Sequence, residues 1–503
     1  MEKKSFKSRL VRYMDAGFPI LYLNTFEEDK VDAIIKEISS GKEVYEWNET
    51  NGYIDFETKT PMQEDCTLET MLDQLKTMDL LERKIIVLKD ITSYLDEARI
   101  VAKIKGIAKK INQGADATVM IVSSTLVIPK ELEKYITILE MDYLTTEEIK
   151  DVIKNFIDEN ELDPLTENLI EEFASAFKGL TEFEINNLLA LSYADDGELT
   201  KSDLELIFDQ KQQMIKKAGI LEMIPLKESI DDIGGLENLK EWFVRKAKVY
   251  KNMNAALQYG VDMPKGVLIA GVPGCGKSLN AKAAANLFEV PLLRLDMGRL
   301  MGKYVGESEW NLRKAIMLAE AISPCVLWID ELEKAFAGIG GGGGVAEVTT
   351  RLFGNFLTWM QEKESATFVV ATANDITKLP PELLRKGRFD EIFYVKLPNA
   401  AEREKIFTIH INKRRSPRWK NNIDIPELVA VTKGFSGADI EGVIKDAVET
   451  AFADGKDVIG TDDVKKAISN TQSLSKIMKD AIEKMTKEYE TRKFKNASRI
   501  GEE

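Results

Sequence analysis

Residues 271–278 read GVPGCGKS and follow directly on the apolar run GVLIAG at 266–271. This is the full G-x-x-x-x-G-K-[ST] pattern of a phosphate loop, placed between a predicted strand and a predicted helix. Its glycines let backbone N–H groups curl around phosphate oxygens, and the helix that follows adds its positive end. In that geometry Lys277 reaches the β- and γ-phosphates, and Ser278 places its hydroxyl on Mg²⁺. We expect the following residues to bind a nucleotide: Val272, Pro273, Gly274, Cys275, Gly276, Lys277, Ser278 and Leu279.

Two carboxylates end a second apolar run, CVLWIDE at 325–331. A buried strand would deliver Asp330 to a metal at its carboxyl end, where open α/β sheets hold their ligands. Glu331, one residue further on, can polarise an attacking water. An Asp-Glu pair after an apolar strand can also be a solvated strand end, but beside a phosphate loop it predicts hydrolysis. Asn374, in the run TFVVATAN at 367–374, would hold the water without neutralising Glu331.

A third group lies at 383–390, LLRKGRFD, where Arg385 and Arg388 flank a glycine. The planar fork of an arginine suits a γ-phosphate reached across a subunit boundary, an effect worth on the order of 10³–10⁵ in rate. The alternative is that the two arginines form a plain charged surface.

The elements that must position these residues can be read from the same half of the chain. Apolar runs at 266–271, 291–296, 325–330, 367–374 and 392–398 alternate with helical patterns. Such runs suit strands that are covered on both faces, and their alternation with helices suits a parallel sheet. From about residue 401 the pattern is helical to the end.

The first half repeats this order in weaker form. Its apolar runs lie at 20–24, 85–90 and 118–125, and a helical stretch follows to about residue 217. Asp90 ends its run as Asp330 does later in the chain. We interpret the repetition as an internal duplication.

Composition narrows the classes of protein. A length of 503 residues suits two to four domains, and a net charge of −15 argues against general binding to duplex nucleic acid or anionic membranes. The one dense basic run, at 413–420, is either a solvated loop or a polyanion contact. Three cysteines without paired spacing and a single histidine predict neither a disulfide framework nor a zinc site. With no secretion signal and no apolar span of about 18 residues, we expect a cytoplasmic protein without a membrane span.

Together these motifs resemble the AAA family of ATPases over roughly residues 231–469. DDIGGL at 231–236 resembles the family's segment whose backbone lies beside adenine, and GFSGAD at 434–439 resembles the second sensor of its helical lid. His410 matches the lid histidine near the nucleotide, although a lone histidine is more often a buried core residue. The resemblance implies these further nucleotide contacts: Asp232, Ile233, Gly234, His410, Gly437 and Ala438.

Within the family, LLRLD at 292–296, VLWIDELEKAFAG at 326–338 and FLTWMQEK at 356–363 resemble one branch. It consists of bacterial and algal-plastid AAA proteins known as hypothetical chloroplast open reading frame ATPases. The resemblance implies an α/β fold: a P-loop AAA+ parallel five-stranded sheet with a helical lid, preceded by a degenerate AAA-like α/β domain. The expected boundaries are 1–217 for the degenerate domain, 218–230 for a linker, 231–400 for the AAA large subdomain, 401–475 for the lid and 476–503 for a charged C-terminal helix or tail.

The first half departs from the family pattern. At the position of its phosphate loop the chain reads NTFEEDK at 24–30, with no glycine and with three acidic residues that would repel phosphate. Ile91 follows Asp90, so the hydrolytic carboxylate is missing too. We expect this domain to be unable to use nucleotide and to be a structural or recruiting module. In the second half, Cys275 stands where threonine is common; it is either a thiol of lowered pKa and redox sensitivity or inert loop filler.

The family resemblance also implies a ring of six subunits. Loops after the second strand then face a central channel, and GKYVGESE at 302–309 resembles the family's pore loop, with Lys303, Tyr304 and Val305. Tyr304 and Val305 could grip an extended polypeptide through non-specific apolar contact, or Tyr304 could pack into a subunit contact. The glycine run at 338–344 is either a second channel-side loop or a linker.

We therefore expect an ATP-hydrolysing homo-oligomeric ring motor that remodels or unfolds protein substrates through a central pore. ATP and Mg²⁺ are the cofactors that this function needs. The alternative is a nucleotide-controlled assembly switch or scaffold that does not thread a chain. A nucleic-acid motor or loader is less expected, because the chain is acidic and has no broad basic patch.

Overall fold

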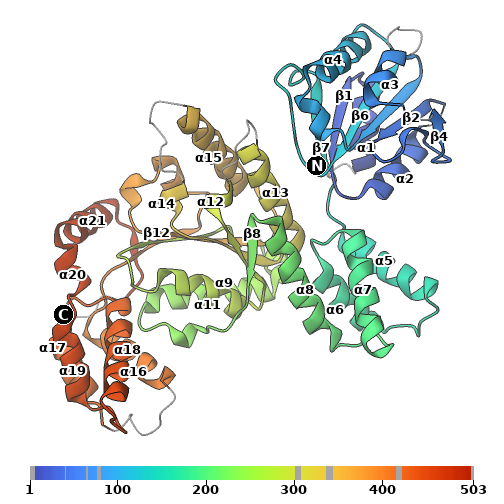
Figure 1. Ribbon diagram of the computed structural model, residues 1–503. Helices are drawn as coiled ribbons and strands as arrows, with labels where there is room; N and C mark the ends of the chain where they lie inside the picture. Colours follow the sequence, from blue (N-terminus) through green and yellow to red (C-terminus); the bar gives the residue numbers. More distant parts are fainter. Residues whose placement is uncertain are drawn as a thin grey trace. The chain divides into compact units, whose positions relative to one another are not determined.

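The computed structural model describes residues 6–39, 41–63, 66–75, 81–300, 307–335, 344–414 and 422–499 (Figure 1). The chain divides into two compact units, one of residues Met1–Phe156 with Leu180–Leu189 and one of Ile157–Gly179 with Ala190–Glu503. Each unit contains one seven-stranded sheet.

The first sheet has the strand order β4-β3-β2-β5-β6-β1-β7, in which the last five strands are parallel. Helices α1 and α2 pack with Leu21 and Leu23 on one face, and α3 and α4 pack with Tyr22 and Ile86 on the other. The strands are β1 (Ile20–Asn24), β2 (Glu43–Asn48), β3 (Gly52–Asp55), β4 (Pro61–Gln63), β5 (Lys84–Lys89), β6 (Ala117–Ser123) and β7 (Ile136–Glu140). The helices are α1 (Phe6–Asp15), α2 (Glu28–Ile38), α3 (Leu68–Gln74) and α4 (Ala98–Asn112).

Four helices follow the first sheet along the chain. They are α5 (Thr146–Glu159), α6 (Glu167–Phe177), α7 (Glu182–Asp196) and α8 (Asp203–Ala218). Thr166 caps the N-terminus of α6 by accepting a hydrogen bond from the backbone of Leu169.

The second sheet has the strand order β14-β13-β9-β12-β11-β10-β8. Its five central strands are the five predicted from sequence, and they pair in parallel, which confirms the predicted α/β fold. Two short edge strands enlarge it: β8, inside the predicted linker, runs antiparallel to β10, and β14 pairs with β13. The strands are β8 (Leu221–Ile224), β9 (Gly266–Gly271), β10 (Leu292–Leu295), β11 (Cys325–Ile329), β12 (Thr367–Ala373), β13 (Glu391–Val395) and β14 (Lys495–Asn496).

Helices cover both faces of this sheet (Figure 1). α9 and α11 share a core with Val267, Ile269 and Trp328, and α13 and α15 cover the opposite face. The helices here are α9 (Glu237–Lys251), α10 (Met253–Tyr259), α11 (Lys277–Phe288), α12 (Met297–Leu300), α13 (Glu307–Ile322), α14 (Leu332–Ala335) and α15 (Gly344–Glu362).

The C-terminal part is helical, as predicted, and carries its own core around Phe407, Leu428 and Ile440. Its helices are α16 (Ala400–Lys413), α17 (Ile425–Val431), α18 (Gly437–Ala453), α19 (Thr461–Asn470), α20 (Leu474–Ile477) and α21 (Lys479–Arg492). The ring of Tyr489 in α21 stacks on Tyr394 of β13 with centroids 3.8 Å apart, and the chain then returns to the sheet as β14.

The two sheets repeat one strand order, β2-β5-β6-β1-β7 in the first and β10-β11-β12-β9-β13 in the second. The central strands are also paired in the same register in the two sheets, as the residue pairs at their starts show. These are Ile20 with Val119 and Lys84 with Ala117 in the first sheet, and Gly266 with Val369 and Cys325 with Thr367 in the second. The duplication inferred from the sequence is thus visible in the topology.

The register of the paired strands corrects one detail of the sequence-based comparison between the two halves. Counted from the paired strand starts, Lys89 stands where Asp330 stands, and Asp90 stands where Glu331 stands. Asp90 and Glu331 also share a left-handed backbone, with φ of 56° and 50°. The sequence-based match of Asp90 with Asp330 is therefore wrong by one residue. The expectation that the first half lacks a carboxylate at the hydrolytic position is wrong as well, because Asp90 stands there; the residue it lacks is the aspartate, which Lys89 replaces. A shift of one residue turns every side chain to the opposite face of a strand, and only the neighbouring strands reveal it.

Candidate active site

A cavity of about 580 Å³ lies within the second unit, between the loop after β9, the ends of β11 and β12, and helices α16 and α18. Val272 is the one predicted nucleotide-binding residue that does not line it; Val272 is buried and its backbone N–H donates to Val395. The predicted residues that do line it are Asp232, Ile233, Gly234, Pro273, Gly274, Cys275, Gly276, Lys277, Ser278, Leu279, Asp330, Glu331, Asn374, His410, Gly437 and Ala438.

The loop between β9 and α11 is shaped by its glycines and by the lid. Gly274 has φ of 72°, and a Cβ placed on it would lie 3.0 Å from the Cβ of Ala438. The carbonyl of Gly274 accepts a hydrogen bond from the backbone N–H of Ala438 at 2.9 Å. A larger residue would be strained and would push the lid away, so glycine is required here.

Lys277 lies at the start of α11 and is 7% exposed. Its Nζ donates to the carbonyl oxygens of Gly271 at 2.9 Å and Val272 at 2.8 Å. Burial lowers the pKa of Lys277 to about 8. A desolvated ammonium beside a curled loop and a helix N-terminus is a site prepared for an anion, and the arrangement fits the phosphates of a nucleotide.

Two side chains with oxygen atoms, those of Ser278 and Asp330, line the same cavity as Lys277. Ser278 Oγ donates to Asp330 Oδ1 at 3.0 Å, so the second residue of α11 and the end of β11 are already joined. A hydroxyl and a carboxylate are donors that Mg²⁺ accepts, and both line the cavity. The donor set therefore fits a magnesium ion.

Thr372 of β12 belongs to this group, and sequence reasoning missed it. Its hydroxyl donates to Asp330 Oδ1 and accepts from the backbone N–H of Glu331 at 3.0 Å. The available signal was a polar residue inside the otherwise apolar run TFVVATAN. Only strand pairing reveals that this hydroxyl faces Asp330.

The carboxylate of Glu331 is bound by two neighbouring side chains. Asn374 Nδ2 donates to its Oε1 at 3.1 Å, and Lys334 Nζ donates to its Oε2 at 2.6 Å. The backbone N–H of Asn374 is itself held by Glu333 Oε1 at 3.0 Å. Glu333 is buried, which raises its pKa, and sequence reasoning missed this role.

The opposite end of the cavity is lined by the segment at 232–236 and by helix α16. Gly234 approaches α16 so closely that a Cβ would lie 2.4 Å from Ile406 Cγ1. Glu402 of α16 accepts from the backbone N–H of Leu236 at 3.0 Å, which fixes the same segment. His410, also on α16, has its pKa lowered by burial, so its imidazole is neutral at pH 7.

Cys275 is not an activated thiol. Burial raises its pKa to about 11, and the positive charge of Lys277 offsets only part of that effect. The hypothesis of a redox-sensitive thiolate is wrong, and the alternative of inert loop filler is left.

The two predicted arginines lie elsewhere. Arg385 is exposed, and Arg388 is half-buried with its Nη1 donating to the carbonyl of Glu382. Neither lines the cavity of its own chain. Lys303, Tyr304 and Val305 of the predicted pore loop lie outside the described residues, as does most of the glycine run at 338–344. Within the described ranges, no helix has the length and apolar character needed to cross a bilayer.

Comparison with known families covers most of the chain. Residues 267–397 match the ATPase family associated with various cellular activities (AAA), and residues 422–466 match the AAA+ lid domain. Residues 6–141 and 147–218 match the N-terminal and second domains of SpoVK-like AAA ATPases.

Individual relatives agree with these families. The chain is 38% identical over 478 residues to the AAA domain-containing protein ycf46 of Guillardia theta, covering 94% of this chain and 92% of the relative. It is 37% identical over 487 residues to ycf46 of Pyropia yezoensis, covering 96% and 97%. The ATP-dependent zinc metalloprotease FtsH of Mycoplasmopsis synoviae is 33% identical over 259 residues, covering 51% of this chain and 38% of that protein. With the phosphate loop, the paired carboxylates and the lid in place, the chain belongs to the AAA family of ATPases, enzymes that hydrolyse ATP, and within it to the group that includes the ycf46 proteins.

Proposed function

We propose that this ATPase is a ring motor that remodels or unfolds protein substrates. The observation that carries the catalytic part is the meeting of Asp330, Glu331 and Asn374 at one end of the cavity, beside Lys277 and Ser278. The protein-directed part rests on the pore-loop pattern at 302–306 and on the similarity of the AAA segment to an ATP-dependent protease.

Nucleotide binding follows from the cavity. The base would lie along Ile233, Gly234 and His410, and the phosphates would lie along the loop that ends at Lys277. The Lys277 ammonium would exchange its two loop carbonyls for phosphate oxygens, a charge-assisted and stronger bond. Ser278 and Asp330 would hold Mg²⁺, which when bound neutralises charge on the β- and γ-phosphates.

Hydrolysis needs a base and a positioned water. Glu331 would accept the proton of the attacking water, while Asn374, already bonded to its Oε1, would orient both. The Lys334 ammonium now holds the second oxygen and must release it for Glu331 to act as a base. Both partners of that ion pair are exposed to solvent, which screens their attraction, so the pair opens easily.

A neighbouring subunit would complete the site. Arg385 is exposed and outside the cavity of its own chain, which supports a role at the γ-phosphate of an adjacent copy. Such a shared site needs a homo-oligomer, and the family pattern favours a ring of six. In that ring Lys303, Tyr304 and Val305 would line the channel and grip a polypeptide.

The catalytic assignment is tested with Glu331→Gln. We expect ATP turnover to fall by at least ~10²-fold while ATP affinity is kept, because the amide cannot accept the proton but preserves the shape of the side chain. Glu362→Gln, an exposed change at the end of α15, is the control and should be neutral. Normal turnover by Glu331→Gln would refute the catalytic role of Glu331.

Threading is tested separately with Tyr304→Ala and Tyr304→Phe. If the loop grips a chain, an unstructured test polypeptide stimulates turnover of the Tyr304→Phe protein but not of the Tyr304→Ala protein. Equal stimulation and equal unfolding of a tagged substrate by both would refute the grip by Tyr304, and no stimulation or unfolding by the parent protein would leave the assembly switch as the function. Stimulation by duplex DNA would favour the nucleic-acid motor instead.

A further inference from the structure

The first domain repeats the AAA sheet, but its loop after β1 cannot form a phosphate cradle. Three residues, 25–27, connect β1 to α2, whereas five residues, 272–276, connect β9 to α11. Within the short loop, the backbone N–H of Thr25 donates to Ser123 at 3.1 Å and that of Glu27 donates to Thr25 Oγ1 at 3.0 Å. These amides are satisfied by the chain itself and do not converge on a ligand.

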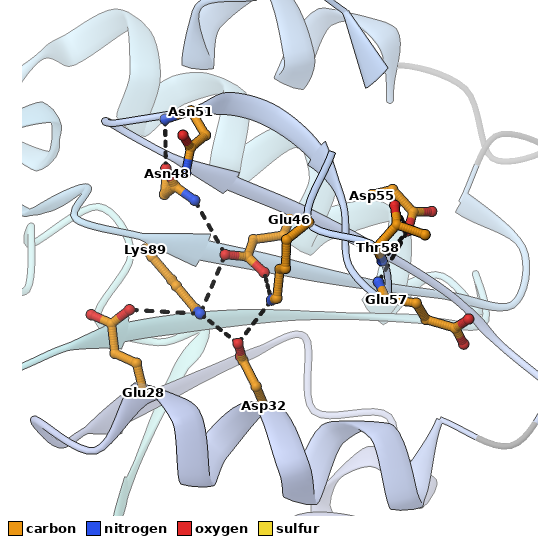
Figure 2. A network of polar contacts seen from close by, with 10 residues as sticks. Glu28, Asp32, Glu46, Asn48, Asn51, Asp55, Glu57, Thr58 and Lys89 are labelled. Carbon is orange, nitrogen blue, oxygen red and sulfur yellow. Dashed lines mark hydrogen bonds and ion pairs between the residues drawn. The ribbon is translucent and has the colours of Figure 1, made fainter. Parts of the chain in front are cut away.

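A lysine replaces the metal-binding aspartate in this domain. Lys89, at the register position of Asp330, lies 2.9 Å from Asp32 Oδ2, 3.2 Å from Glu46 Oε1 and 3.6 Å from Glu28 Oε2 (Figure 2). The side chains of Lys89 and Glu46 are 6% and 2% exposed. Burial alone would lower the pKa of Lys89, but the bond to Asp32 and the nearby carboxylates outweigh it and raise the pKa.

Further contacts fill the site. Lys59 Nζ also donates to Asp32 Oδ2, at 2.8 Å, and to Glu46 Oε2. Figure 2 shows Asn48 pointing its amide toward Glu46, a hydrogen bond of 3.2 Å, while its own oxygen accepts from the backbone of Asn51. The ammonium groups at the centre are therefore each paired with carboxylates, while Asp32 Oδ1 is buried without a hydrogen-bond partner among the described residues.

The charges of the two domains are reversed across the same pair of elements. In the second domain, helix α11 supplies Lys277 and Ser278, and strand β11 is followed by the carboxylate of Asp330. In the first, helix α2 supplies the carboxylates of Glu28 and Asp32, and strand β5 supplies the ammonium. In both domains side chains bond the helix to the strand end, and in the first domain they do so without a ligand.

The turn that begins α7 is held by the loop after β1, as the start of α18 is held by the loop after β9. KGLTEFE at 178–184 repeats KGFSGAD at 433–439, and Gly179 and Gly434 have φ of 82° and 85°. In the second domain the backbone of Ala438 donates to the loop carbonyl of Gly274. In the first, the backbone N–H of Glu182 donates to the Glu27 carboxylate at 3.0 Å, and Lys30 lies 3.7 Å from the Glu182 carboxylate.

We propose that the first domain has replaced nucleotide and metal with its own side chains. Lys89, bound by Asp32, Glu46 and Glu28, holds helix α2 to the sheet, and Glu27 holds the start of α7. The domain keeps these contacts through every state of the ATPase cycle, and the chain has one nucleotide site. This inference does not depend on whether the ring threads protein.

The nucleotide arm of the test uses the full-length chain. In equilibrium dialysis with labelled ATP and Mg²⁺, the Glu331→Gln protein should bind one ATP per chain, and Lys277→Ala should bind none. In hydrogen exchange, ATP should slow exchange at 271–279 of the Glu331→Gln protein and leave 24–31 unchanged. Two ATP per chain, or protection at 24–31 in the Lys277→Ala protein, overturns the proposal.

The side-chain arm compares Lys89→Met with Lys36→Met, an exposed change on α2. Removing the Lys89 ammonium leaves Asp32 and Glu46 short of a buried counter-ion, so the first domain should melt at least ~5 °C lower, with faster exchange in β5 and α2. Adding Asp32→Asn to Lys89→Met should recover part of that loss, because one unpaired charge is removed. Equal stability of Lys89→Met and Lys36→Met overturns the role of the network. If Lys89→Met does not fold at all, the ATP stoichiometry still decides the proposal.

Discussion

A single hydroxyl, that of Thr372, connects the two carboxylate-bearing residues of the active site. It donates to Asp330 and accepts from the backbone N–H of Glu331, whose φ of 50° is rare for a residue with a side chain. Thr372 is buried, so water cannot replace either bond. The hydroxyl therefore stabilises the turn that points Glu331 toward Asn374.

Thr372→Val tests that role because it keeps the shape of the side chain and removes the hydroxyl. The lost bonds leave a buried N–H without its partner, a cost of about 1–3 kcal/mol that the turn can relieve by moving. Misplacing Glu331 by about 1 Å should lower kcat about 10- to 100-fold. KM for ATP should change little, since Lys277 and the loop are intact.

Thr372→Ser is the matched control, since it retains the hydroxyl. Steady-state ATPase assays should place its kcat within about threefold of the parent protein. A Thr372→Val protein as active as Thr372→Ser would show that the turn is held by other contacts.

At the scale of elements, the sequence predicted the five central strands of the second sheet and missed the two at its edges, and in the first sheet it also missed β2, which lies between β3 and β5. β9, β11 and β12 are continuous apolar runs, so their composition identifies them without knowledge of neighbours. β8 and β14 are short, and each forms because an outer strand of the sheet offers unpaired backbone groups. The segment around β14 carries little pattern, although Ala497 and Tyr489 are buried.

Register is a second limit of prediction at this scale. The sequence matched Asp90 with Asp330 because both follow an apolar run. Pairing with β6 shows that Lys89 is the equivalent residue, and that change alone reverses the charge of the first site. The phosphate loop, in contrast, could be located from the sequence because its residues are contiguous, and of the residues predicted in it Val272 alone does not line the cavity.

Helices α6 and α8 are joined through a buried lysine. Lys211 of α8 is 3% exposed, and its Nζ donates to the carbonyl of Ala176 in α6 at 2.6 Å. Burial, with a smaller contribution from the charge of Lys178, lowers its pKa to about 7. In an unfolded chain the same lysine has a pKa near 10.4, so between these values the unfolded state binds more protons than the folded state.

The sign of the resulting pH dependence is fixed by that difference. Stability should rise with pH from about 7 toward 10, because folding no longer has to remove a proton from Lys211 or bury its charge. Lys211→Met has no charge to bury, so it should melt at a higher temperature than the parent at pH 7. Between pH 7 and 9 the difference in melting temperature between Lys211→Met and the parent should shrink. The change corresponds to about 2 kcal/mol in the free energy of unfolding.

Lys216→Met, an exposed change on the same helix, is the control and should follow the parent protein. Comparing differences between variants at each pH cancels the other titrating groups of the chain. Parallel melting curves for the parent and Lys211→Met from pH 7 to 9 would show that Lys211 is protonated in the folded protein.

At the scale of the whole molecule, the chain joins one module that carries a nucleotide cavity to one whose equivalent site is filled by paired side chains. The cavity is lined by the loop that ends at Lys277 and by Ser278, Asp330 and Glu331, and no arginine among the described residues of the chain lines it. An ATPase of this family without an arginine at the γ-phosphate would lack a large part of its rate enhancement. We propose that a second copy supplies this charge, and Arg385 is the better candidate because Arg388 is bound to Glu382.

Mixing two inactive proteins tests whether Arg385 acts on a neighbour. Lys277→Ala loses its own ATP site but keeps Arg385, and Arg385→Ala keeps its ATP site but cannot complete an adjacent one. Each alone should lose at least ~10²-fold in turnover. A randomly mixed 1:1 ring should recover up to about one quarter of parental turnover per chain, since about half of the Arg385→Ala subunits then face an intact arginine. Lys277→Ala mixed with Glu331→Gln should recover nothing, because both changes damage the site within one chain. If the first mixture also stays inactive while native mass spectrometry shows mixed rings, Arg385 does not act across the subunit boundary.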